Sequence, residues 1–255
     1  MMKHPTKRSD NRKALPKFLA SILIATLLGG VVGYFSAMAV DSSLTDSLPE
    51  LLGHILTVAA PWGIPVSAAL LLLPSTWLLV QSKRLAATWD GEEEALPDAV
   101  EQKLSYVILL TSIAMVLGFF FLAAVMVYPS SLRAILGTVG AMGLAIVWEM
   151  LLQQKTVDLI REINPEKQGS VYDTNFSKKW MESCDEAQKK EIGEAAFQAF
   201  RFTGSACIFL WALLMFAHVA FDVGLLAISL PLVIFLILQV SYQLYVMKNS
   251  WKRSH

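Results

Sequence analysis

Long apolar stretches without charge alternate along the chain with short segments that are dense in charge. A bilayer core about 30 Å thick takes roughly 20 helical residues to cross, and six stretches reach that length. They are Phe18–Val40, Trp62–Val80, Leu104–Tyr128, Ala134–Leu152, Thr203–Ala220 and Leu225–Val246. The pattern predicts an all-α, polytopic membrane helix bundle with about six transmembrane helices, in a single integral membrane domain over residues 1–255.

The basic residues indicate how the chain is threaded. Lys and Arg accumulate on the cytoplasmic side of membrane proteins. Twenty of the 21 lie in the N-terminal tail, the segments 81–103 and 153–202, and the C-terminal tail, whereas Arg133 lies between spans three and four. We therefore expect both termini and two helical segments in the cytoplasm, and a location in the cell membrane.

The first span allows two interpretations. A basic tail, an apolar run and Ala37-Met38-Ala39 resemble a signal peptide with its cleavage site, but the run also suits an uncleaved span. On the outer side, Ser47 and Glu50 have the spacing of a capping box within the acidic segment Asp41–Pro61, which predicts a short helix at the outer surface.

The inner segment 153–202 has helical signals of its own. Span four is expected to continue as a helix through Ile163, where Pro165 prevents its extension, and residues 167–175 are expected to form a loop. Ser183 and Glu186 have the spacing of a second capping box. A helix that leads into span five should start there.

Small residues at four-residue spacing predict where helices contact one another in the bilayer. Lipid tails are as apolar as Leu, so close backbone approach replaces apolar burial as a driving force. Two sets have this spacing: Gly29, Gly33 and Ala37 in span one, and Gly137, Ala141 and Ala145 in span four.

Three ionisable residues in or near the spans are candidates for function. Glu149 lies 16 residues beyond Arg133, about 24 Å along a helix, near the predicted inner interface. It either belongs to an ion or substrate pathway or reaches water or a loop lysine. His218 and Asp222 share a helix face and could hold a metal or transfer protons, or simply form a polar helix end.

The inner segments also offer partner-docking residues. Each has a Trp shortly before an acidic cluster, a pattern that suits docking to a basic surface but also ordinary helix caps and interfacial Trp. The candidates are Trp89, Asp90, Glu92, Trp180, Asp185 and Glu186.

Composition and motifs argue against several other functions. Only 16% of residues are charged, the formal net charge is zero, and no nucleic-acid partner is indicated. Cys184 and Cys207 have neither metal-ligand nor disulfide-framework spacing. Intramembrane CAAX-type proteases carry a Glu-Glu-x-x-x-Arg motif. Glu93-Glu94 does not complete this motif, because position 98 is Asp. We expect no catalytic residue, no cofactor and no metal.

Two signatures resemble a known family. They are Trp89-Asp90-Gly91-Glu92 with Lys103-Leu104-Ser105, and Pro165-Glu166-Lys167-Gln168-Gly169 with the segment from Trp180 to Ala187. The chain resembles multi-pass membrane proteins of Gram-positive bacteria (Firmicutes), catalogued as domain of unknown function 3169. The resemblance implies a cytoplasmic-membrane protein and no activity.

Three functions are compatible with this sequence. The first is a non-enzymatic membrane protein with a regulatory or immunity role that binds a partner through its cytoplasmic segments. The second is a transporter or ABC-type permease subunit, paired with a separate ATPase subunit. The third is an intramembrane enzyme, which lacks a visible catalytic constellation. The lipid bilayer is an expected partner in each case, and a homo-oligomer is possible.

Overall fold

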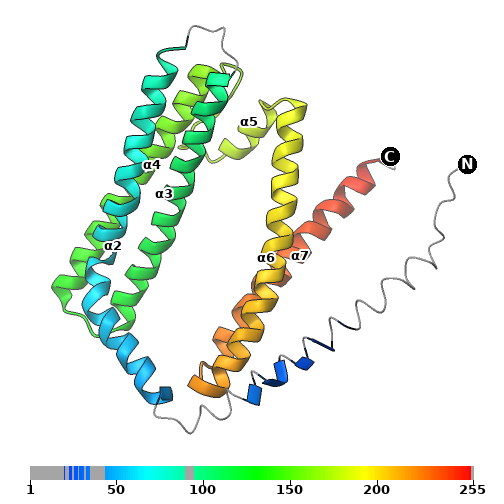
Figure 1. Ribbon diagram of the computed structural model, residues 1–255. Helices are drawn as coiled ribbons and strands as arrows, with labels where there is room; N and C mark the ends of the chain where they lie inside the picture. The colour runs from blue at the N-terminus through cyan, green and yellow to red at the C-terminus, as the bar shows by residue number, and fades with distance from the viewer. Residues whose placement is uncertain are drawn as a thin grey trace, which may run out of the picture. The chain divides into compact units, whose positions relative to one another are not determined.

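The computed structural model describes residues 20, 23–24, 26–27, 29–31, 33–34, 44–89 and 95–253. In this part of the chain every regular element is a helix. The elements are α2 (Leu44–Ala86), α3 (Ala95–Val127), α4 (Leu132–Ile163), α5 (Phe176–Glu182), α6 (Glu186–Phe221) and α7 (Leu225–Arg253) (Figure 1).

Five helices of the described part are long and apolar enough to cross a membrane. They are Pro49–Ala86, Leu96–Val127, Leu132–Ile163, Glu186–Val219 and Leu225–Met247. Their outward faces carry exposed large apolar side chains such as Leu70, Val116 and Leu144, which suit contact with lipid tails. The chain is therefore an all-helical integral membrane protein. Most of the first predicted span, and all of Ala37–Ala39, lie outside the described residues.

The helices α2 and α4 differ in how well the sequence predicted their ends. The predicted short outer helix is not separate, because α2 runs without a break from Leu44 through Pro49 and Pro61. Ser47 lies inside this helix, so the capping box with Glu50 is wrong. Proline removes one backbone donor, but the turns on either side keep their own hydrogen bonds. The end of α4 at Ile163, shortly before Pro165, agrees with the prediction.

The chain divides into two compact units, residues 51–194 and residues 1–50 with 195–255. In the first unit α2, α3 and α4 run alternately up and down as a three-helix bundle (Figure 1). The buried positions of α3 and α4 recur every three or four residues, the spacing of a coiled-coil interface. We call these interior positions the seam: Val100, Leu104, Val107, Thr111, Ala114 and Gly118 on α3, and Met142, Ala145, Glu149, Leu152, Thr156, Leu159 and Ile163 on α4.

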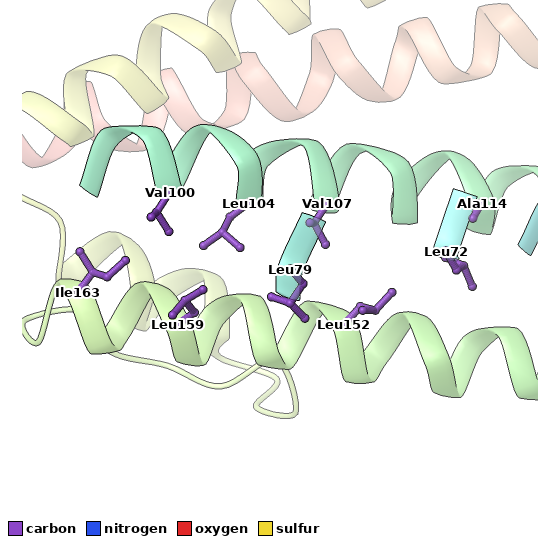
Figure 2. Close-up of a cluster of buried hydrophobic side chains, with 9 residues drawn as sticks. All are labelled: Leu72, Leu79, Val100, Leu104, Val107, Ala114, Leu152, Leu159 and Ile163. Atoms are coloured by element: carbon purple, nitrogen blue, oxygen red, sulfur yellow. The ribbon is translucent and has the colours of Figure 1, made fainter. Parts of the chain in front are cut away.

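Figure 2 shows the main apolar cluster of this bundle, in which side chains from α2, α3 and α4 point toward one another. Leu72 and Leu79 contribute from α2 and meet the apolar members of the seam. The cluster extends to Val100 and Ile163, at the end of the bundle where α4 stops. The core of this unit is therefore continuous along the helices.

Two glycines allow the closest helix contacts, and neither belongs to the two sets of small residues from which contacts were predicted. A Cβ atom on Gly63 would lie 2.2 Å from the Phe121 ring, and one on Gly118 would lie 2.9 Å from Met142 Sδ. The predicted contact at Gly137 is wrong, because a Cβ there would have nothing within 4 Å. Gly137 is one residue off the buried face of α4, which passes through Thr138 instead.

In the second unit, α6 and α7 form a hairpin. The turn between them has positive φ at Asp222 (49°) and Gly224 (83°). The rings of Phe200 and Tyr242 stack with centroids 5.0 Å apart. Cβ atoms on Gly29 and Gly33 would lie 3.9 and 3.5 Å from the Phe216 ring, so these two glycines do meet a neighbouring helix, as predicted. Ala37 of the same predicted set lies outside the described residues.

Candidate functional site

The segment between α4 and α6 folds into a defined structure, which we call the cap (residues 164–192). Its loop returns along α4, where Gln154 Oε1 accepts hydrogen bonds from Ser170 Oγ (3.0 Å) and Val171 N–H (2.9 Å). Asn164 Nδ2 donates to Glu101 Oε1 of α3 at 2.7 Å. The cap is thus held to the ends of both helices through side chains.

Lys167 lies at the centre of the cap and is only 5% exposed. Its Nζ donates to Cys184 Sγ at 3.1 Å and to Gln188 Oε1, and it lies 5.5 Å from the centroid of the Trp180 ring. All three partners are electrically neutral. None of the ion pairs found in the described part of the chain involves Lys167.

A pocket of about 310 Å³ lies beside Lys167. It has a polar side and an apolar side, and its lining comes from α3, α4, the cap loop, α5 and the start of α6. The lining residues are Glu101, Ser105, Ile108, Ile160, Lys167, Trp180, Cys184, Gln188, Glu191 and Ile192. Its volume lies near the lower end of the range for small-molecule sites, roughly 300–1,000 Å³.

Helix α6 is capped by a different pair from the one predicted. Asp185 Oδ1 accepts from Gln188 N–H at 2.7 Å, and Gln188 Oε1 accepts from Asp185 N–H at 3.3 Å. Ser183 instead ends α5, since its hydroxyl donates to Trp180 O at 2.8 Å and accepts from Gln168 N–H at 3.1 Å. The capping box is therefore Asp185 with Gln188, two residues after the predicted Ser183.

Three of the predicted docking residues, Trp180, Asp185 and Glu186, lie in the cap. Trp180 is half-buried between Lys167 and Phe176, whereas Asp185 and Glu186 are exposed. Glu186 pairs with Lys189 at 3.0 Å. Nearby, the Asp173 carboxylate accepts from Lys179 Nζ at 2.5 Å, and this hydrogen bond lowers the pKa of Asp173.

The other three docking candidates come from the segment between α2 and α3. Trp89 is half-buried and packs against the apolar cluster of the bundle. It lines a second pocket, of about 210 Å³, together with Lys83 and Glu162. Asp90 and Glu92 lie outside the described residues. The structure therefore places Trp89 and Trp180 in separate pockets of the same unit.

Glu149 lies inside the three-helix bundle and is 2% exposed. Its Oε2 has no hydrogen-bond partner among the described residues, and none of the ion pairs found there joins Glu149 to a loop lysine. The hydrogen bond from Trp148 Nε1 to Thr76 Oγ1 (3.2 Å) places Glu149 level with the buried Ser75 of α2.

Two further buried oxygens lie along the same interior. Ser82 Oγ and Thr156 Oγ1 also lack a hydrogen-bond partner within the described part of the chain. Each is seven residues beyond the level of Ser75 and Glu149, about 10 Å along the helices. Of the buried residues in the described part of the chain, Glu149 and Lys167 alone carry ionisable acidic or basic side chains.

His218 and Asp222 form the end of α6 rather than a larger cluster. His218 Nδ1 lies 3.3 Å from Asp222 Oδ1 and 3.4 Å from Gly224 N, and Asp222 N–H donates to His218 O at 2.9 Å. These contacts close the helix at its turn. Among the described residues, no three His, Cys, Asp or Glu side chains are grouped so that they could hold a metal ion.

Four residues of these sites were not predicted from the sequence: Lys167, Gln188, Ser82 and Thr156. Thr156 could have been found, because it follows Glu149 by seven residues and so falls on the same helix face. The burial of Lys167 had no such signal, since a lysine in a polar loop is normally exposed.

The family described as "Protein of unknown function (DUF3169)" matches residues 9–246 of this chain. No curated protein and no solved structure matches it.

Proposed function

The chain belongs to this family of unknown function, and we propose that it is a non-enzymatic protein of the cell membrane whose cap lies in the cytoplasm and binds a protein partner, in a regulatory or immunity role. One observation carries the proposal. The cap is a folded structure held to α3 and α4 by side-chain hydrogen bonds, whereas a mere connection between two spans needs no such contacts.

The charge on the cap indicates the kind of partner. Residues 164–192 contain six carboxylates and five lysines, and Lys167 is buried. The accessible surface is therefore acidic in excess. Glu182 and Glu186 are well exposed, beside the exposed Met181. This surface is complementary to a protein with a basic face.

Reversing the exposed charges tests this proposal while leaving the packing of the cap intact. Trp180 and Asp185 are poor choices, because they contact Lys167 and cap α6. We expect the double variant Glu182→Lys/Glu186→Lys to lose a cytosolic partner that the wild-type protein captures after crosslinking in cells. Glu50→Lys, at the other end of α2, is the control and should retain it.

Unaltered capture by the double variant would refute docking through this acidic surface. Co-purification of a nucleotide-hydrolysing subunit would instead support the permease alternative.

A transport function is the second candidate, and Glu149 favours it. A carboxyl group buried among membrane-length helices is costly, and such groups commonly belong to ion or substrate pathways. The unpartnered Ser82 and Thr156 hydroxyls on the same interior could contribute oxygens to a cation pathway.

A matched pair of substitutions on α4 tests this second candidate. In proteoliposomes with proton- and sodium-sensitive dyes, Glu149→Gln should abolish cation uptake, because it removes the buried ionisable carboxyl group. Glu162→Gln, on the exposed side of the same helix, should leave uptake unchanged. No uptake by the wild-type protein, or equal uptake by both variants, would exclude a cation pathway through Glu149.

A further inference from the structure

The cap contains a buried lysine, Lys167, that has no carboxylate at ion-pair distance among the described residues. An ammonium group withdrawn from water is costly unless an anion is close to it. Around Lys167 the structure supplies a thiol, an amide oxygen and an indole ring, all of them neutral. The pocket of about 310 Å³ lies next to this group, so a ligand can bring the missing negative charge.

The same pocket also presents negative charge. Glu101 and Glu191 belong to its lining, and Asn164 Nδ2 holds Glu101 through Oε1. A simple anion at Lys167 would therefore bind close to two carboxylates. A ligand with a positive group linked to its anion is complementary to both sides of the pocket.

The apolar side of the pocket indicates that this ligand is an amphiphile. Ile108, Ile160 and Ile192 line it, and Ile108 and Ile192 are also exposed on the outside of α3 and α6. Because α3 and α4 are long enough to cross the membrane, their ends beside the cap lie where lipid headgroups meet water. Trp180, another lining residue, is of a type enriched at this boundary.

We propose that this pocket is a binding site for a zwitterionic phospholipid headgroup of the phosphoethanolamine type. The phosphate binds Lys167, the ammonium binds Glu101 and Glu191, and the acyl chains leave along Ile108 and Ile192 into the bilayer. The pocket volume suits a headgroup and excludes a whole lipid. The site does not depend on the proposed protein partner.

Competition on the wild-type protein tests the ligand. Full-length protein, delipidated in detergent, is titrated with phosphatidylethanolamine, with phosphatidylglycerol and with free phosphoethanolamine, and binding is followed by native mass spectrometry. We expect phosphatidylethanolamine to bind about ten-fold more tightly than phosphatidylglycerol, which lacks the ammonium group. Equal binding of the two lipids overturns the proposal. So does a result in which free phosphoethanolamine binds but phosphatidylethanolamine does not.

Substitutions then test the residues. Lys167→Met removes the cation at similar length and should weaken phosphatidylethanolamine binding about ten-fold or more. Lys178→Met, a highly exposed lysine of α5, is the control and should have no effect. Glu101→Gln should bind both lipids but lose the preference for the ethanolamine headgroup. Retained preference in Glu101→Gln overturns the proposal even if Lys167→Met does not fold.

Discussion

At the scale of single residues, the closest packing in the bundle occurs at Gly63. A Cβ atom there would lie 2.2 to 2.5 Å from three carbons of the Phe121 ring, far inside van der Waals contact. An aromatic ring on a packed helix cannot withdraw as a flexible side chain can. Glycine at this position therefore sets how closely α2 approaches α3, which agrees with the use of small residues between membrane helices.

Replacing Gly63 by Ala should destabilise the protein by about 1–3 kcal/mol, because the helices must separate to admit the methyl group. The measurement is thermal unfolding of the detergent-solubilised protein. Gly137→Ala is the matched control on α4, since a Cβ there would meet nothing within 4 Å and Ala favours the helix. A melting temperature lowered equally in both variants would contradict this assignment.

At the scale of elements, the N-terminus of α6 distinguishes two capping schemes. The structure pairs Asp185 with Gln188, and Glu186 accepts no backbone hydrogen bond in the described contacts at this helix start. Asp185→Ala should therefore cost about 1 kcal/mol and increase hydrogen exchange of the first amides of α6. Glu186→Ala should leave this exchange nearly unchanged. A larger increase in hydrogen exchange for Glu186→Ala than for Asp185→Ala would instead support the predicted capping box of Ser183 with Glu186.

The local sequence predicted the boundaries of some helices but not of others. Apolar length predicted the later spans, and Pro165 marked the end of α4. The capping of α6 was ambiguous, because Ser183 and Asp185 are both good N-cap residues. Continuity of α2 was hidden by Pro49 and Pro61, which ordinarily mark a boundary.

The candidate site was less predictable than the helices, since its residues come from separate segments. Trp180 and Glu149 stand out as residue types, but the buried environment of each depends on tertiary packing. Lys167, Gln188 and Glu101 are brought together only because the cap loop returns to the end of α3. No periodicity in the sequence encodes that return.

At the scale of the whole molecule, the predicted orientation can be tested at the start of α4 and in α5. Both natural cysteines are buried, so a new exposed cysteine can be labelled selectively. We expect Arg133→Cys to react with a membrane-impermeant maleimide in intact cells, and Lys178→Cys to react only after the cells are opened. Labelling of Lys178→Cys from outside would reverse the topology and remove the basis for a cytoplasmic partner.

The lengths of the bundle helices have a consequence for its chemistry. At 1.5 Å per residue, the 43 residues of α2 extend about 64 Å and the 32 residues of α4 about 48 Å, against a hydrocarbon layer of about 30 Å. The last turns of α4, with Lys155, Asp158 and Arg161, therefore extend beyond the lipid tails into the headgroup layer and the adjoining water. The continuous core of the bundle is thus surrounded by lipid tails along part of its length and by a more polar environment near the end of α4. The hydrophobic effect stabilises the core around Leu159, so urea should unfold this end of the bundle first. Close packing stabilises the part of the core that lies among the lipid tails.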